Sequence, residues 1–211
     1  MKPNQNISGT MKLVVTVLAA WLALVVFLGL HGTFTKPPGI PPLPILLAVV
    51  VPVVVFLIAF QFSKSFRQLV LTFDPRLAAG MQAWRFAGLG FLALYANGVL
   101  PGAFAWPAGI GDIAVGITAP WVMLALIQRP GFATSKLFVL WNWFGMLDLI
   151  VAVGSGGLNS LFARGIMGEI TTRPMTQMPL VLIPAYFVPI FFALHLAVLF
   201  QMRWGSRQSP R

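Results

Sequence analysis

Six long apolar segments, joined by short polar or proline-rich connections, restrict what this sequence can fold into. Each is close to the ~20 helical residues that cross a ~30 Å hydrocarbon layer. Backbone N–H and C=O groups must be paired internally in hydrocarbon, so segments of this kind favour α-helices. The sequence therefore predicts an all-α integral membrane protein, a six-transmembrane-helix bundle that forms one domain over residues 1–211. The predicted helices cover residues 13–31, 43–62, 81–99, 108–127, 136–154 and 178–202.

The connections differ in character. Residues 33–44 contain five prolines and are expected to be extended and stiff. Residues 63–80 are predicted to be a loop of mixed charge. Residues 154–177 form a second long connection, in which 161–170 is predicted to be a short interfacial helix. The first apolar segment lacks a good cleavage site, so we expect an uncleaved helix rather than a signal peptide.

The few charged residues are distributed unequally between alternate connections. Only 9% of the 211 residues are charged, and the net charge is +10. Lys36, Arg164 and Arg173 fall on one side of the predicted bundle, and all other Lys and Arg residues fall on the opposite side. By the positive-inside rule we expect both termini to be cytoplasmic. We expect the protein to lie in the cell membrane, as a multi-pass protein of a bacterial inner membrane. The expected partner is therefore the lipid bilayer, and nucleic acid is excluded because no basic stripe is interleaved with exposed aromatics.

Two carboxylates inside apolar helices are the feature that composition does not explain. Asp112 shares a helical face with the small residues Ala108, Gly116 and Ala119, where another helix can approach closely. Asp148 lies in the next helix, which runs antiparallel and is expected to be its neighbour. Helical rise places both in the outer half of the bilayer. Two carboxylates that face each other at low dielectric do not both ionise, so the pair is predicted to bind a proton, a cation or a polar solute.

Each carboxylate also has a structural interpretation. Gly111-Asp112 resembles a helix start, in which the carboxylate caps free amide groups. Asp148 is preceded by about two helical turns, so its alternative role is an interhelical hydrogen bond.

Trp84 and Arg85 are predicted to meet lipid headgroups near the start of the third helix. The same depth estimate puts Arg85 about 10 Å from either aspartate, which argues against an ion pair.

The histidines and Tyr186 complete the set of candidate residues. His31 ends the first helix at the outer surface, where it or Tyr186 would supply a third polar group beside the aspartates. A metal site of His31 with the two aspartates has no ligand motif to support it, so we expect neither metal nor cofactor. His195 lies on the opposite half and is expected, like Asn97 and Asn142, to form hydrogen bonds between helices.

Three functions stay open at this level. The first is a small binding or carrier protein that uses the buried carboxylates. The second is a non-catalytic accessory subunit of a membrane complex, and the third is a membrane-embedded enzyme that acts near the outer interface. No hydrolase, zinc-protease, P-loop or dinucleotide motif is present, and the chain has no cysteine. We therefore assign no catalytic residue, and the sequence does not decide between a monomer and a homo-oligomer.

Overall fold

The computed structural model describes residues 3–208, and its regular structure in that range is helical throughout. It contains six helices that are long and apolar enough to cross a bilayer. This confirms the predicted all-helical class and the number of bilayer-length helices. The six spans are Ser8–Leu30, Leu43–Phe62, Pro75–Ala96, Gly102–Gln128, Lys136–Phe162 and Ile183–Trp204.

Several of these spans are built from more than one kind of helical turn. The third combines α4, a 3₁₀ segment and α5, and the sixth begins with a π-helical turn before α8. The elements are α1 (Pro3–Leu30), α2 (Leu43–Phe62), α3 (Lys64–Thr72), α4 (Pro75–Met81), the 3₁₀ segment Gln82–Gly88, α5 (Leu89–Ala96), α6 (Gly102–Gln128), α7 (Lys136–Phe162), the π-helical turn Ile183–Phe187 and α8 (Val188–Gln208), with short 3₁₀ turns at Phe132–Thr134 and Arg173–Thr176.

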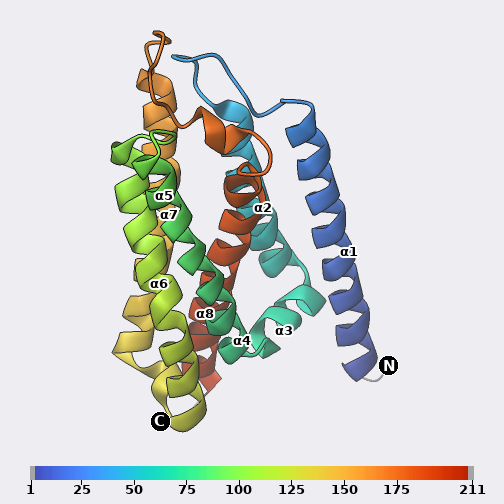
Figure 1. Cartoon of the computed structure of the whole chain (residues 1–211). Coiled ribbons are helices and arrows are strands. Elements are labelled where there is room, and N and C mark those ends of the chain that lie inside the picture. Colours follow the sequence, from blue (N-terminus) through green and yellow to red (C-terminus); the bar gives the residue numbers. More distant parts are fainter. Residues whose placement is uncertain (1–2, 209–211) are drawn as a thin grey trace.

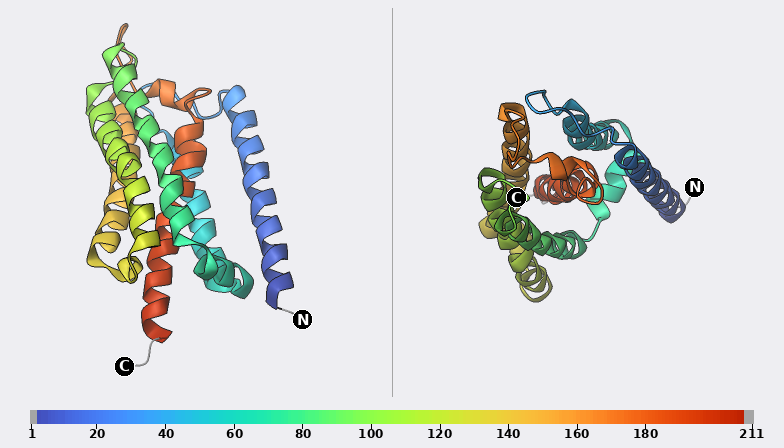
Figure 2. Two further views of the ribbon diagram at one scale, coloured as in Figure 1. Left: turned by 60° about the horizontal axis from the view of Figure 1, so that its bottom comes forward. Right: turned by 45° about the horizontal axis from the view of Figure 1, so that its top comes forward.

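Helix α8 occupies the middle of the arrangement. It packs against α7 and α4 on one side and against α2 and α3 on the other. Helices α5, α6 and α7 run side by side, whereas α1 stands at the edge of the molecule (Figures 1 and 2). The interior of the protein is therefore shared mainly by the third to sixth spans.

Three predictions about the connections and helix bounds are wrong. Residues 63–80 are not a loop, because Ser63 and Asp74 cap the first turns of α3 and α4: Ser63 Oγ accepts from Phe66 N at 3.2 Å, and Asp74 Oδ1 accepts from Arg76 N at 2.8 Å. The short helix predicted at 161–170 does not form, because α7 continues through its glycines to Phe162 and the chain is then irregular up to the turn Arg173–Thr176.

The third wrong prediction concerns α6. The helix begins directly after the extended residue Pro101 and accommodates Pro107 in its interior. Asp112 therefore lies ten residues inside α6, and its interpretation as a helix cap is wrong. Asp148 lies near the middle of α7, and Asp112 lies somewhat nearer the start of α6 than its end.

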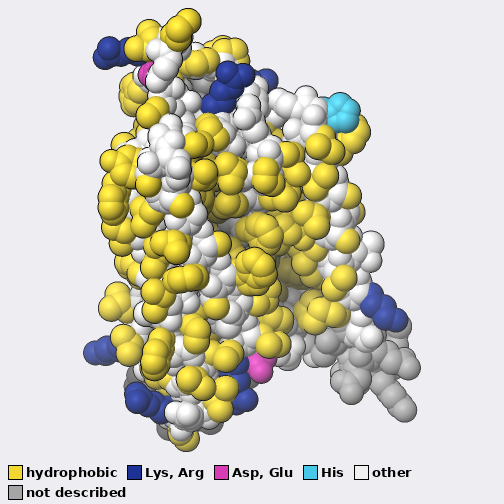
Figure 3. All heavy atoms as spheres, viewed as in Figure 1, with side chains coloured by type: hydrophobic (Ala, Val, Ile, Leu, Met, Phe, Trp, Pro, Cys, Tyr) yellow, Lys and Arg dark blue, Asp and Glu magenta, His cyan; other side chains and the backbone are white. Residues whose placement is uncertain are grey.

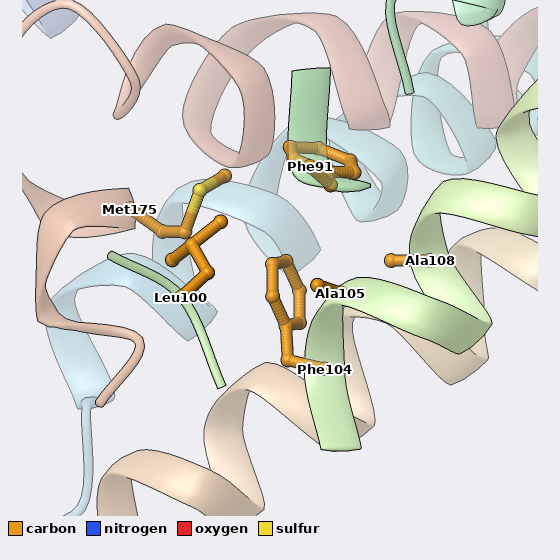
Figure 4. Close-up of a cluster of buried hydrophobic side chains, with 6 residues drawn as sticks. All are labelled: Phe91, Leu100, Phe104, Ala105, Ala108 and Met175. Atoms are coloured by element: carbon orange, nitrogen blue, oxygen red, sulfur yellow. The ribbon is translucent and has the colours of Figure 1, made fainter. Parts of the chain in front are cut away.

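Near one end of the bundle, an apolar cluster packs between α5, α6 and the turn Arg173–Thr176. In Figure 4 the side chains of Phe91, Phe104 and Met175 converge from these three elements. The rings of Phe91 and Phe104 lie 5.4 Å apart between centroids. On the face shown in Figure 3, charged side chains gather at the two ends and the band between them is largely apolar.

Candidate functional site

Arg85 is the centre of a buried ion-pair cluster. Arg85 is 2% exposed, and its guanidinium group binds carboxylates from two helices. Nε donates to Asp112 Oδ1 of α6 at 2.7 Å, and Nη2 donates to Asp148 Oδ2 of α7. One cation therefore bridges the two aspartates.

Glycines allow the backbones to come close enough for this cluster. A Cβ atom on Gly116 would lie 2.2 Å from Phe86 N, so α6 contacts the backbone of the 3₁₀ segment directly. A Cβ atom on Gly111 would lie 1.6 Å from Asp148 Oδ1, and one on Gly145 would lie 2.3 Å from His195 Nε2. The predicted small-residue face of α6 is thus a contact surface, and the segment that approaches it carries Arg85.

The guanidinium group also contacts α7 and α8. Arg85 Nη1 donates to the Gly145 carbonyl oxygen at 3.1 Å and lies 3.3 Å from His195 Nε2. His195 Nδ1 lies 2.9 Å from Asn142 Oδ1, while Asn142 Nδ2 donates to the Phe138 carbonyl oxygen at 2.8 Å. This pattern fits a neutral His195 whose Nδ1–H donates to Asn142 and whose Nε2 accepts from Arg85. The interhelical hydrogen bond predicted for His195 is confirmed.

Gln82 precedes Arg85 by one turn of the 3₁₀ segment. It is 1% exposed, and its Nε2 donates to the Phe191 carbonyl oxygen of α8 at 3.2 Å. Its Oε1 has no hydrogen-bond partner among the described residues. The buried polar groups of this segment thus bind both α7 and α8.

A cavity of about 70 Å³ lies beside the cluster, between α2 and α7. Its walls are mostly apolar, and among the described residues that line it Asp112 is the one that is charged. The Asp112 side chain is 13% exposed, against 5% for Asp148 and 1% for Arg85. Because one water molecule needs roughly 10–15 Å³, the cavity has room for several next to Asp112. The aromatic and thioether groups of Figure 4, Phe91, Phe104 and Met175, form part of its wall.

The π-helical turn Ile183–Phe187 forms another part of this wall. Ile183 and Pro184 line the cavity, and Pro184 lacks the N–H that would continue a regular helix. Widened turns of this kind occur mostly as single insertions in α-helices and are frequent at functional sites.

Residues 42–203 match the protein family described as "Domain of unknown function (DUF8737)". The chain belongs to this family. No curated protein and no solved structure matches the chain. The DUF8737 match includes every residue of the ion-pair cluster and the walls of the cavity, and it excludes α1.

Within the DUF8737 region, Asp112 and Asp148 meet at Arg85, but the other predicted site residues lie elsewhere. Tyr186 points to α1, where its hydroxyl group donates to the Leu18 carbonyl oxygen at 3.3 Å. His31 lies outside the DUF8737 match, is exposed at the end of α1 and contacts the Phe27 carbonyl oxygen through Nδ1 at 2.8 Å. Residues 8–204, whose side chains are described, contain no group of three His, Cys, Asp or Glu side chains that would hold a metal ion.

The expectation that Arg85 reaches lipid headgroups and cannot pair with the aspartates is wrong. The third span of the DUF8737 bundle begins at Pro75 rather than at residue 81, so Arg85 lies ten residues into it. Part of that stretch is 3₁₀ helix, which rises ~2.0 Å per residue instead of 1.5 Å. Arg85 is therefore about 15–20 Å from the end of its span, level with Asp112 and Asp148. Trp84, in contrast, is 73% exposed on the outside of the bundle.

A signal for this cluster was present in the sequence. Away from their ends, the six spans carry three charged residues, Arg85, Asp112 and Asp148. Charged groups in such segments face the interior and pair with one another, so the count alone predicts the partners that the depth estimate rejected.

Proposed function

We propose that this chain is a multi-pass membrane protein whose Arg85, Asp112 and Asp148 cluster binds a proton or a small cation, and that it acts as a small binding or carrier protein. The apolar surface band and the six bilayer-length helices support the membrane placement. Of 14 Lys and Arg residues, only Lys36, Arg164 and Arg173 belong to the connections on one side. This imbalance supports cytoplasmic termini.

The charge balance of the cluster supports a bound positive charge. Two carboxylates share one guanidinium group. A neutral His195 accepts a hydrogen bond from the same guanidinium group and adds no charge. With both aspartates ionised, the cluster would carry one uncompensated negative charge in a low-dielectric interior. A proton or a cation neutralises it.

The single observation that carries the proposal is the position of Asp112. It binds Arg85 through Oδ1 and also borders the cavity, whereas Asp148 and Arg85 are more completely enclosed. A proton or a cation that enters the cavity meets Asp112 first. The π-helical turn and Pro184 give this wall of the cavity a place where the sixth span can bend, as a carrier would require.

Infrared difference spectroscopy of the protein in nanodiscs tests the binding step. We expect a carbonyl band from a protonated carboxyl group that titrates with pH, is absent in Asp112→Asn and is unchanged in Asp74→Asn, which alters an exposed helix cap. Displacement of the band by Na⁺ or K⁺ at fixed pH would identify a cation in place of the proton. If no variant of Asp112 or Asp148 changes the spectrum, the cluster binds no proton.

Transport is tested separately, in proteoliposomes that contain a pH-sensitive dye. A carrier moves protons down an imposed gradient, and Asp112→Asn abolishes the movement. Proton binding without any movement would leave a binding protein and remove the carrier.

A second candidate, a non-catalytic accessory subunit of a membrane complex, is favoured by the partners of Arg85. All three guanidinium nitrogens have partners, on α6, α7 and α8, so the cluster is also a device that fixes these helices together. For this role hydrogen bonding suffices. A doubly substituted Asp112→Asn, Asp148→Asn protein that folds and retains its cellular phenotype would favour this candidate over the first.

A further inference from the structure

The cavity beside Asp112 adjoins a smaller hollow at the end of the bundle where α2 begins. The two share Pro42, Ser160 and Thr176 in their walls, so they adjoin. The smaller hollow, of about 20 Å³, is lined by Lys36 and Arg173. A mostly apolar cavity thus has a basic mouth.

The two cations at this mouth lack an acidic partner in the part of the chain that the structure describes. Neither Lys36 nor Arg173 forms an ion pair with any residue of the described part of the chain. Glu169, the acid in the same connection, is already engaged: it accepts backbone hydrogen bonds from Arg164 N at 2.9 Å and Gly165 N at 2.7 Å. These bonds, that of Arg164 foremost, hold the pKa of Glu169 below its usual range, so it stays a bonded carboxylate at neutral pH. The mouth is complementary to an anion.

The length and lining of the cavity fit a hydrocarbon chain. Along α7 the lining residues run from Ser160 to Leu149, eleven residues or about 16 Å at the helical rise. That is about half of a ~30 Å hydrocarbon core, the depth of one leaflet. On the α2 side the wall is Ile45, Leu46 and Val49.

We propose that the cavity and its basic mouth bind an anionic phospholipid, whose phosphate group lies between Lys36 and Arg173 and one of whose acyl chains lies between α2 and α7. The acyl chain ends short of Asp112, which is paired with Arg85, so the space beside that carboxylate stays open to a proton or a small cation. Basic pockets between membrane helices bind anionic headgroups in this way. This inference rests on the membrane placement proposed above. It names a ligand for the cavity that Asp112 lines.

Native mass spectrometry of the protein released from nanodiscs of equal phosphatidylglycerol and phosphatidylcholine tests the headgroup contact. We expect wild-type protein to retain phosphatidylglycerol preferentially, and the preference to fall about fivefold for each cation removed in Lys36→Gln and Arg173→Gln. The matched control is Arg164→Gln, which removes a cation from the same connection but does not line either hollow. No preference in the wild type, or an equal loss in the control, would overturn the proposal.

A second pair of variants tests the acyl chain. Gly157 lines the cavity, and a Cβ atom on it would meet Leu46 Cδ2 at an ordinary van der Waals distance of 3.8 Å, so Gly157→Leu narrows the cavity without a clash at Cβ. Gly154→Leu places the same side chain on the exposed face of the same helix, where no atom lies within 4 Å. We expect bound lipid to be lost only in Gly157→Leu, with both proteins monodisperse. Retention in Gly157→Leu would show that no chain enters the cavity.

Failure of this inference and failure of the proposed function are distinguishable in the same samples. Asp112→Asn is expected to keep the lipid preference while it loses the carboxyl band. Loss of the lipid preference in Asp112→Asn would contradict a headgroup site at Lys36 and Arg173.

Discussion

Helix α1 and the span Pro75–Ala96 are both long enough to cross a bilayer, yet they are held in opposite ways. The most apolar stretch of the α1 span, Ser8–Leu30, has a mean hydropathy of 2.8, and 11% of its residues are buried. In the span Pro75–Ala96 the mean hydropathy is 1.2, and 33% of the residues of the corresponding stretch are buried. The less apolar helix is the more buried one. Lipid tails are as apolar as leucine, so burying an apolar side chain against another helix is little more favourable than leaving it in lipid. Burying a polar side chain where it finds a hydrogen-bond partner is more favourable than leaving it in lipid.

The contacts of the two spans follow the same division. Helix α1 meets the rest of the protein through apolar packing around Val25 and through the hydrogen bond from Tyr186 to Leu18. The span Pro75–Ala96 places Gln82 and Arg85 inside and binds α6, α7 and α8 with them. The family match covers the second arrangement and not the first. We infer that the polar centre organises the fold and that α1 is added to it.

The largest effect on stability is expected when the central cation, Arg85, is removed. Arg85→Met leaves two neighbouring carboxylates without their partner, which is expected to destabilise the protein by about 3–5 kcal/mol. Thermal unfolding in detergent measures the change. Arg76→Met, at an exposed position of the same span, is the control and is expected to change stability by less than ~0.5 kcal/mol.

A rescue variant separates charge from packing in this test. Replacing Asp112 and Asp148 by Leu in the Arg85→Met background removes the uncompensated charges and is expected to recover much of the lost stability. If Arg85→Met unfolds at the same temperature as Arg76→Met, the polar centre does not organise the bundle.

The second prediction concerns the close approach that places Arg85. Gly116→Ala forces a Cβ atom against the backbone at Phe86, where no side-chain rotation relieves the clash. We expect a loss of about 2–3 kcal/mol, since overpacking of a backbone contact typically costs about this much. Gly90→Ala adds the same atom in open space and is expected to stabilise α5 slightly, by ~0.5 kcal/mol. Equal unfolding temperatures for the two variants would contradict direct backbone contact between α6 and the 3₁₀ segment.

The six helices were predictable from the sequence, because an apolar segment of bilayer length pairs all its backbone N–H and C=O groups within itself when it forms an α-helix. All six predicted helices have a counterpart, and α2 begins and ends at the predicted residues. The face of Ala108, Gly116 and Ala119 was also predictable, since spacing alone puts small residues on one side of a helix.

The partner of the aspartates was missed because it depended on where a helix begins. Asp74 caps α4 through a local hydrogen bond, which adds six residues to the third span and carries Arg85 to the middle of the bundle. The change from α to 3₁₀ turns over Gln82–Gly88 adds further depth and has no simple signal in the sequence. An error of six residues in the start of one helix therefore led to the prediction of a headgroup contact in place of an ion pair.

The smallest predicted effect belongs to α1. Tyr186→Phe removes the hydroxyl group that donates to the Leu18 carbonyl oxygen but keeps the ring, which lies 4.8 Å from Trp21 between centroids. Hydrogen bonds between membrane helices average about 0.6 kcal/mol, so the unfolding temperature is expected to change little. Because α1 packs against the rest of the protein around Val25 through apolar side chains, the effect is expected to be local. Hydrogen exchange should become faster in α1 around Leu18 while α6 and α7 keep wild-type protection. Uniformly faster exchange in all three helices would mean that α1 unfolds together with the polar centre, and α1 would then be an integral part of the bundle rather than an addition to it.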